Sequence, residues 1–265
     1  MIKDKIVFIT GASSGIGAAC AKQFAKAGAT LLLCARRLDV LNPLATQLQG
    51  EYGIDVHIFC LDVRERIAVT ETINALPDKW KNIDVLINNA GLAAGLDLIQ
   101  EGYIQDWEDM IDTNVKGLLY VTREILPQMV NRNAGHIINI GSIAGHQNYP
   151  RGAVYCATKQ AVNALSNGLR LDLFGTKIRV STVDPGAVET NFSAVRFKGD
   201  LKRAAAVYEG MEPLQPNDVA DAVLYCATRP PHVNISEVII MPTAQAAATM
   251  TYRQTPADSM PKSTG

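Results

Sequence analysis

Apolar runs and helical patterns alternate along most of the chain. Runs that are apolar at almost every position predict strands buried on both faces, and they lie at residues 5–10, 29–35, 55–63, 83–91, 135–142, 178–186 and 237–242. Between them, apolar residues recur at helical spacing and predict amphipathic helices at 15–28, 37–52, 64–80, 107–132 and 153–175. Buried strands separated by helices favour a parallel sheet that is covered on both faces.

No linker, repeat or low-complexity block interrupts this alternation over about the first 240 residues. It predicts a single α/β domain, a Rossmann-type doubly wound parallel sheet of about seven strands with helices on both faces. The last residues are rich in Thr, Ala, Ser and Pro, which is typical of a mobile tail or of a segment packed on a neighbouring subunit. We expect a domain at residues 1–242 and a C-terminal tail at 243–265.

Charge and composition narrow the class of protein. With a net charge of −1 over 265 residues, electrostatics favours neither nucleic acid nor an anionic membrane as a partner. The first residues carry charges too close to too short an apolar run for a signal peptide. No apolar segment approaches the roughly 18 residues that cross a bilayer. We expect a cytoplasmic protein with no nucleic acid and no membrane partner.

The positions of the cysteines and histidines also favour a cytoplasmic protein. The five cysteines are scattered and contain no C-x-x-C, which argues against a disulfide framework or a zinc site and favours a reducing compartment. The four histidines lack metal-ligand spacing. We therefore expect no metal in this protein.

A glycine-rich segment, "TGASSGIG" at residues 10–17, joins the first predicted strand to the first predicted helix. Its glycines permit a tight turn and bring backbone N–H groups to a phosphate, and the helix N-terminus behind them favours negative charge. In Rossmann sheets, ligands bind beyond the carboxyl ends of the strands, where this segment lies. The spacing G-x-x-x-G-x-G departs from the usual G-x-G-x-x-G, so a plain strand-to-helix turn stays open on this motif alone.

The end of the second predicted strand distinguishes the two nicotinamide cofactors. An acidic residue there would bond the ribose 2′-hydroxyl of NAD, but this chain has Ala35 followed by Arg36 and Arg37. Two guanidinium groups are well shaped to clamp a 2′-phosphate, although solvated arginines at the start of a helix remain an alternative. The sequence favours NADP over NAD.

In "GAVYCATKQAV", Tyr155 precedes Lys159 by four residues, which places both side chains on one face of a helix. A phenol beside an ammonium group can serve as a proton donor with its activator. The same spacing recurs by chance in many helices, so the pair by itself does not separate this role from an ordinary surface contact.

Several short motifs follow one another in a fixed order, namely "TGASSGIG", "LDV" at 61–63, "NNAG" at 88–91, "TNVKG" at 113–117, "GS" at 141–142, "YCATK" at 155–159 and "DPG" at 184–186. Each of these motifs is weak alone. Together they resemble the short-chain dehydrogenase/reductase family, whose phosphate loop has the G-x-x-x-G-x-G spacing. The stretches at 76–97, 106–130, 135–146, 195–200 and 230–242 resemble the NADP-dependent 3-hydroxy acid dehydrogenase branch, which includes serine or L-allo-threonine dehydrogenases and malonic semialdehyde reductases.

The resemblance implies roles for four residues. Tyr155 would be the general acid/base, and because a free phenol has a pKa near 10, Lys159 and the charged nicotinamide ring would favour its phenolate. Lys159 would also bond the nicotinamide ribose, and Ser142 would hold the substrate oxygen against Tyr155. Asn114 would bend its helix locally and fix a water that links Lys159 to solvent. Taken singly, Ser142 fits a strand cap equally well, and Asn114 a helix irregularity.

The resemblance also implies a set of cofactor contacts along the predicted strand ends. This set is Thr10, Gly11, Ser13, Ser14, Gly15, Ile16, Gly17, Arg36, Arg37, Asp62, Val63, Asn89, Gly91, Tyr155, Lys159, Pro185, Gly186, Val188 and Thr190. Family members are mostly homotetramers, so a homotetramer is expected, partly through the two long helices around Asn114 and Lys159.

The segment at 191–206 corresponds to the region that closes over substrate in this family. It offers Arg196 as the anchor for an acidic substrate, with Arg151 as a competing candidate and solvated charges on a mobile lid as the alternative. The expected function is hydride transfer between NADP and a small 3-hydroxy acid. Rival functions are an NADPH-dependent carbonyl reductase for sulfoacetaldehyde or neutral ketones and aldehydes, and a catalytically silent cofactor-binding regulatory protein.

Overall fold

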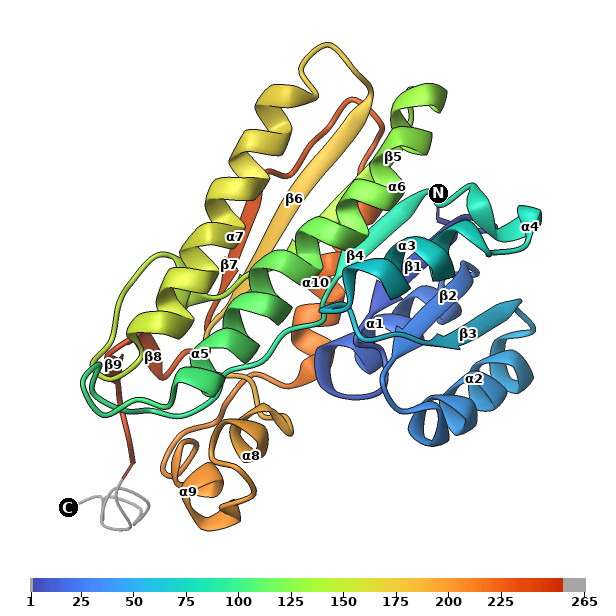
Figure 1. The fold of residues 1–265 in the computed structure, drawn as a ribbon. Coiled ribbons are helices and arrows are strands. Elements are labelled where there is room, and N and C mark those ends of the chain that lie inside the picture. The colour runs from blue at the N-terminus through green and yellow to red at the C-terminus, as the bar shows by residue number, and fades with distance from the viewer. Residues whose placement is uncertain (1, 255–265) are drawn as a thin grey trace, which may run out of the picture.

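A seven-stranded parallel sheet forms the centre of the computed structural model, which describes residues 2–254 (Figure 1). Its strand order is β3-β2-β1-β4-β5-β6-β7. The strands are β1 (Ile6–Thr10), β2 (Thr30–Ala35), β3 (Val56–Cys60), β4 (Val85–Asn88), β5 (Gly135–Ile140), β6 (Ile178–Pro185) and β7 (Glu237–Ile240). The strand order reverses between β1 and β4, which confirms the predicted doubly wound α/β sheet and places the ligand crevice at their carboxyl ends.

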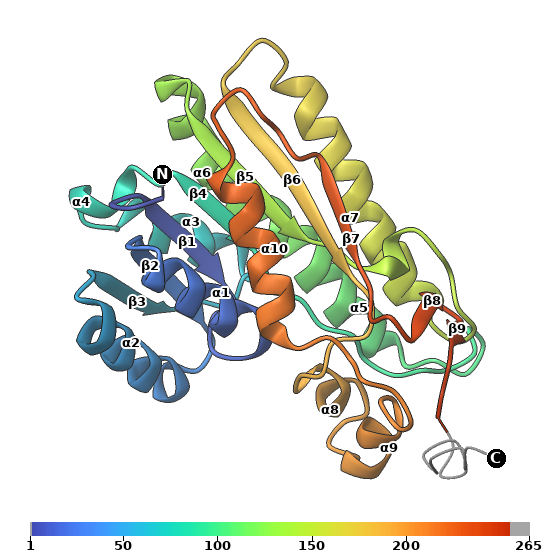
Figure 2. The ribbon, with the colours of Figure 1, turned by 180° about the vertical axis from the view of Figure 1, so that it is seen from behind.

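Helices cover both faces of the sheet. The chain forms α1 (Gly15–Lys26), α2 (Leu38–Tyr52), α3 (Arg66–Asn74), α4 (Asp78–Lys81), α5 (Ile104–Ile111), α6 (Leu118–Arg132), α7 (Ala153–Asp172), α8 (Phe192–Arg196), α9 (Leu201–Ala206) and α10 (Pro216–Thr228). Helices α1, α2 and α10 lie on one face (Figure 2), and α3, α6 and α7 lie on the other.

Strand side chains divide between these two faces with a period of two. Val7 and Ile9 of β1 enter the hydrophobic core under α1, α2 and α10, whereas Phe8 between them enters the core under α3 and α6. All three are fully buried. This explains why β1 is a continuous apolar run, because these successive positions meet a core on one side or the other.

Two predicted helices are divided in the structure. The helix expected at 64–80 ends at Asn74 and resumes as α4 after Pro77, since the residue before a proline is restricted away from helical geometry. The helix expected at 107–132 contains a π-helical segment, Asp112–Gly117, between α5 and α6. Asn114 lies within this segment, where the helical hydrogen-bond pattern changes.

The first part of the predicted tail folds back onto the protein. Residues 245–251 form a small hairpin of β8 (Gln245–Ala247) and β9 (Met250–Thr251). The Gln245 side chain accepts a hydrogen bond from the Ala187 amide at 2.8 Å, and the Ala248 amide donates to the Gln147 side chain at 2.8 Å. Residues 255–265 of the predicted tail lie outside the described residues, and the division at residue 242 stays a prediction. Within residues 2–254, no helix is long and apolar enough to cross a membrane.

Candidate active site

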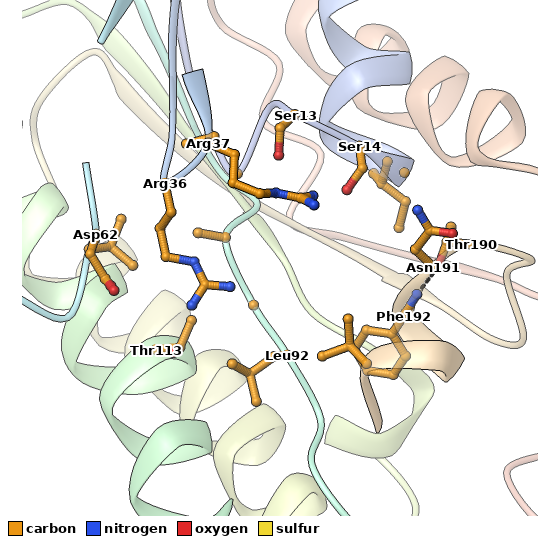
Figure 3. Close-up of a pocket in the computed structure, with 18 of the residues that line it drawn as sticks. Ser13, Ser14, Arg36, Arg37, Asp62, Leu92, Thr113, Thr190, Asn191 and Phe192 are labelled. Atoms are coloured by element: carbon orange, nitrogen blue, oxygen red, sulfur yellow. Dashed lines mark hydrogen bonds between the residues drawn. The ribbon is translucent and has the colours of Figure 1, made fainter. Parts of the chain in front are cut away.

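A cavity opens where β1 to β4 end, beside the start of α1, at the position where doubly wound sheets bind ligands. Figure 3 shows it in close-up. The cavity is lined by Gly11, Ser13, Ser14, Gly15, Ile16, Ala35, Arg36, Arg37, Leu61, Asp62, Val63, Ala90, Gly91, Leu92, Thr113, Thr190, Asn191, Phe192 and Val195. Backbone and polar side chains thus form its phosphate-loop end, and apolar side chains from α8 border the other.

The glycine loop is packed closely against the end of β4. Gly11 has a φ of +64° and Gly15 of +54°, a region that L side chains rarely adopt. A Cβ on Gly17 would lie 2.4 Å from Asn89 Nδ2, which donates hydrogen bonds to the carbonyls of Thr10 (2.9 Å) and Gly11 (3.1 Å). These positions require glycine for geometric reasons, and the loop backbone remains accessible to a phosphate.

Arg36 and Arg37 are exposed at the mouth of the cavity. In Figure 3 the Arg37 guanidinium extends toward Ser13 and Ser14, and that of Arg36 extends toward Thr113. Among residues 2–254, neither arginine forms an ion pair. Two uncommitted cations beside two hydroxyl groups fit a dianionic phosphate group.

Asp62 lines the same cavity but is already committed to protein partners. Arg64 Nη2 donates to Asp62 Oδ2 at 2.7 Å, and Arg64 Nη1 reaches Asp109 at 2.8 Å. Burial opposes ionisation of Asp62, but the Arg64 hydrogen bonds outweigh it and lower the pKa of the carboxyl group. Asp62, predicted from sequence as a cofactor contact, is therefore an anchored carboxylate in the cavity wall.

The four residues expected to be catalytic are all buried, with exposed fractions of 2% for Asn114, 8% for Ser142, 8% for Tyr155 and 7% for Lys159. Tyr155 and Lys159 come from the first two turns of α7, and Ser142 follows β5. Lys159 Nζ donates to the Ile140 carbonyl at 2.9 Å and lies 6.0 Å from the centre of the Tyr155 ring.

Asn114 fastens the loop after β4 to α7. Its amide exchanges hydrogen bonds with the Leu92 backbone at 2.9 and 2.8 Å and donates to Thr158 Oγ1 at 3.0 Å. A Cβ on Gly91 would lie 3.2 Å from Asn114 Oδ1 and 3.7 Å from Lys159 Nζ. The amide, the ammonium group and the cavity wall therefore meet at Gly91.

Burial disfavours the charged form of both members of the Tyr155–Lys159 pair. It lowers the pKa of Lys159 to about 8, against which the Asp184 carboxylate acts. It raises the pKa of Tyr155 far above its ordinary value, and the Arg196 guanidinium and the Ser142 hydroxyl oppose this rise. Phenolate formation here depends on positive charge held close to the ring.

Arg196 at the end of α8 lies inside a cage of aromatic rings. Its guanidinium carbon is 5.1 Å from the centre of the Tyr155 ring, 5.6 Å from Tyr149 and 5.7 Å from Phe192. It donates a hydrogen bond to the Tyr149 hydroxyl. Its Nε is buried and has no hydrogen-bond partner within residues 2–254.

Arg151, the competing candidate, is exposed. It has a φ of +63° and lines a smaller cavity that also includes Asp97, Asp106 and Tyr155. The structure thus brings Arg196 over the Tyr155 ring, and it leaves Arg151 at an outer opening.

We call residues 191–210 the lid, since they pass over this part of the site as α8, α9 and the following turns. The Gly95 amide donates to the Arg196 carbonyl at 3.0 Å, and Lys198 Nζ forms an ion pair with Asp106 at 2.9 Å. At the other end, the Gln254 amide donates to the Gly210 carbonyl at 2.7 Å. The lid is bonded both to the loop after β4 and to the end of the described chain.

Eleven of the nineteen predicted cofactor residues line the cavity. The other eight do not lie in its wall, and they are Thr10, Gly17, Asn89, Tyr155, Lys159, Pro185, Gly186 and Val188. Thr10 and Asn89 brace the glycine loop, and the Val188 carbonyl accepts a hydrogen bond from Tyr208 at 2.7 Å. Eight residues of the wall were not predicted as contacts, although the last three lie in the segment expected to cover the substrate: Ala35, Leu61, Ala90, Leu92, Thr113, Asn191, Phe192 and Val195.

Comparison with known proteins defines the class to which this fold and site belong. The short chain dehydrogenase family matches residues 5–200, and the chain belongs to this family. Among its relatives, NADP-dependent 3-hydroxy acid dehydrogenase YdfG of Salmonella typhi is 48% identical over 244 residues, 92% of this chain and 97% of the relative. The NADP-dependent 3-hydroxy acid dehydrogenase of Schizosaccharomyces pombe is 43% identical over 254 residues, 96% of this chain and 98% of the relative.

A solved structure of a related dehydrogenase is also similar to this chain. The closed form of serine dehydrogenase complexed with NADP+ superposes with a TM-score of 0.87 at 45% identity, covering 94% of this chain and 100% of that one. The resemblance to the 3-hydroxy acid dehydrogenase branch, inferred from short motifs, is therefore confirmed.

Proposed function

We propose that this protein is an NADP-dependent oxidoreductase that transfers a hydride between the nicotinamide and a small 3-hydroxy acid or its 3-oxo form. Serine, L-allo-threonine and the 3-hydroxypropionate/malonic semialdehyde pair are the substrate types. The observation that carries the proposal is the Arg196 guanidinium 5.1 Å from the ring of Tyr155, which puts a carboxylate anchor beside a proton donor. The activities named for the relatives support the same reaction.

The glycine loop, Arg36 and Arg37 would hold the cofactor. Loop N–H groups and the start of α1 bind its pyrophosphate, and the two guanidinium groups bind its 2′-phosphate. When bound, NADP supplies the group that takes or gives the hydride. Ser13 and Ser14, toward which Arg37 extends, offer hydroxyl donors to the same phosphate.

Tyr155 would transfer the hydroxyl proton of the substrate. In oxidation its phenolate takes the proton while Ser142 holds the substrate oxygen in line, and in reduction the phenol returns it. Because burial raises the Tyr155 pKa, the phenolate needs Lys159 and Arg196 as nearby cations. Asn114 fixes the wall at Gly91 and supports the path by which Lys159 exchanges protons with solvent.

The substrate carboxylate would pair with Arg196. Arg196 Nε is buried without a hydrogen-bond partner among the described residues. A carboxylate oxygen of the substrate would accept a hydrogen bond from this N–H group. The aromatic cage fixes the plane of the guanidinium group and keeps the ion pair away from bulk water, which strengthens it.

Steady-state oxidation of L-serine, L-allo-threonine and 3-hydroxypropionate, with NADP and NAD compared side by side, tests this proposal. We expect higher kcat/KM with NADP than with NAD and higher kcat/KM for the acids than for uncharged alcohols of similar size. Arg196→Ala should raise KM for the acids by about 10- to 100-fold, as a lost charged hydrogen bond predicts, with little effect on a neutral alcohol. Arg151→Ala is the matched control.

An equal effect of Arg196→Ala on acidic and neutral substrates would remove it as the anchor, and an effect confined to Arg151→Ala would transfer the role. Turnover of neutral ketones or sulfoacetaldehyde alone would indicate the carbonyl reductase. Absence of turnover with every substrate, with NADPH still bound, would indicate the regulatory protein.

We further propose a homotetramer in the cytoplasm. Exposed apolar side chains on the two long helical elements support the assembly, among them Ile111 (41% exposed), Leu119 (39%), Leu171 (78%) and, just after α7, Phe174 (92%). All five cysteines are free, as expected in a reducing compartment.

A further inference from the structure

Three side chains with metal-ligating atoms converge behind the catalytic residues. They are His146, which follows the short 3₁₀ helix Ile143–Gly145, Asp184 near the end of β6, and Glu237 at the start of β7. His146 Nε2 lies 3.3 Å from Asp184 Oδ2 and 3.1 Å from Glu237 Oε1. The three ligand atoms all lie within 4.8 Å of one another.

Hydrogen bonds within the protein leave this cluster incomplete. A single proton on His146 Nε2 cannot serve two carboxylates fully, and the Asn163 amide nitrogen also lies 3.1 Å from the same ring nitrogen. The Asp184 side chain is completely buried, and within residues 2–254 its Oδ2 has no hydrogen-bond partner apart from the 3.3 Å contact with His146 Nε2. Asn163 Oδ1 is likewise buried without a partner there.

Among residues 2–254, no lysine or arginine forms an ion pair with Asp184 or Glu237. Asp184 and Glu237 place two carboxylate groups 3.3 and 3.1 Å from the one His146 Nε2. Like charges gathered this closely repel each other, and a cation between them removes that repulsion. Lys159 and Arg170 also act on these carboxylates, but Lys159 Nζ donates to the Ile140 carbonyl, and Arg170 donates to the carbonyls of Val180 and Ser236.

The separations of the two carboxylate oxygens from His146 Nε2 suit a small divalent cation. Metal–ligand bonds of about 2.0–2.2 Å place neighbouring ligand atoms about 2.8–3.1 Å apart in octahedral geometry and about 3.3–3.6 Å apart in tetrahedral geometry. The two separations from His146 Nε2 are 3.1 and 3.3 Å. One imidazole and two carboxylates are a donor set that Zn²⁺ and neighbouring first-row ions accept. The His146 side chain is 24% exposed and that of Glu237 43%, so an ion can enter from solvent.

We propose that His146, Asp184 and Glu237 form a binding site for a divalent first-row transition-metal ion of the Zn²⁺ type. The sequence predicted no metal because the three ligands belong to separate elements and show no local ligand spacing. The site adjoins the catalytic residues, since Asp184 Oδ1 accepts the Ser142 amide at 3.1 Å and Asp184 acts electrostatically on Lys159. A bound ion would fix Asp184 and, through it, the backbone of Ser142.

Calorimetric titration of the chelator-treated full chain with ZnCl₂ tests the site, with Co²⁺ absorption as a second readout. We expect one ion bound per chain, and His146→Ala and Glu237→Gln should each weaken binding by at least about tenfold. His232→Ala, which removes an exposed histidine elsewhere, is the matched control and should leave binding unchanged. Circular dichroism checks that each variant is folded.

Two results would overturn the proposal. One is the absence of saturable Zn²⁺ or Co²⁺ binding to the wild-type chain. The other is binding that persists unchanged in folded His146→Ala and Glu237→Gln, which would assign the ion to a different part of the surface. In either case the cluster would be a histidine hydrogen-bonded between two carboxylates.

Discussion

Removal of the Tyr155 hydroxyl tests its proposed role in chemistry separately from ligand binding. Tyr155→Phe keeps the ring, which packs against Phe192 with 5.7 Å between ring centres, and deletes only the proton donor. We expect kcat to fall by about a thousand-fold, within the range of general acid/base catalysis, while the Kd for NADPH and the Tm stay near wild type. Single-turnover rates and fluorescence titration measure the two effects. A variant with wild-type kcat would require another proton donor.

At the scale of single residues, the sequence was most informative for residues that belong to motifs of the family. Tyr155, Lys159, Ser142 and Asn114 were expected together, and the structure gathers them although their roles remain proposals. The Asn114 side chain was predicted to hold a water, and the structure adds that it bonds the Leu92 backbone. That contact joins two distant segments, so no local pattern could predict it.

The glycine loop at residues 10–17 is an element whose geometry restricts which side chains fit. Gly17→Ala puts a Cβ 2.4 Å from Asn89 Nδ2 and 2.5 Å from the Gly11 carbonyl oxygen, so the loop or the end of β4 must shift. We expect a loss of about 1–3 kcal/mol in the free energy of unfolding and weaker NADP binding. Gly168→Ala in α7 meets nothing within 4 Å and is the control, expected to be neutral or stabilising. Urea unfolding and cofactor titration measure both, and equal behaviour of the two variants would contradict the argument.

Helices and strands could be predicted where apolar residues recur at regular spacing. Their exact bounds could not be predicted where a proline or a π-helical segment interrupts a helix. All seven strands were expected because each lies in a mostly apolar run, although β3 and β7 are only partly buried. The break at Pro77 and the π-helical segment around Asn114 were absorbed into longer helices, since the apolar period continues across both. The hairpin of β8 and β9 could not be predicted, because its bonds to Ala187 and Gln147 are made across the fold.

At the scale of the whole molecule, His136 in β5 links global stability to pH. It is 1% exposed, and burial, followed by the charge of Arg179, lowers its pKa to about 3. The unfolded chain takes up a proton near pH 6.5 and the folded chain does not, so stability is fully present above about pH 6.5 and is lost as the pH falls toward 3. This group alone should cost about 2 kcal/mol between pH 7 and pH 5.

Urea unfolding at pH 7 and pH 5 checks this link. His136→Asn lowers stability at both values because it disturbs a packed site, but it should remove about 2 kcal/mol from the difference between them. His232→Asn, at an exposed position, should keep the wild-type difference. If the difference is the same in wild type and His136→Asn, His136 is not the group responsible.

The attachment of the lid at both ends has a consequence for the entropy of catalysis. A free segment of this length would lose much conformational freedom each time it closed on a substrate. Here the Lys198–Asp106 pair holds the near end and the Gln254–Gly210 bond holds the far end, so that much of this freedom is already given up before any ligand arrives. Binding energy from a small hydroxy acid, which has few atoms to contribute, is then available for orienting its hydroxyl group at Tyr155 rather than for ordering the chain that covers it.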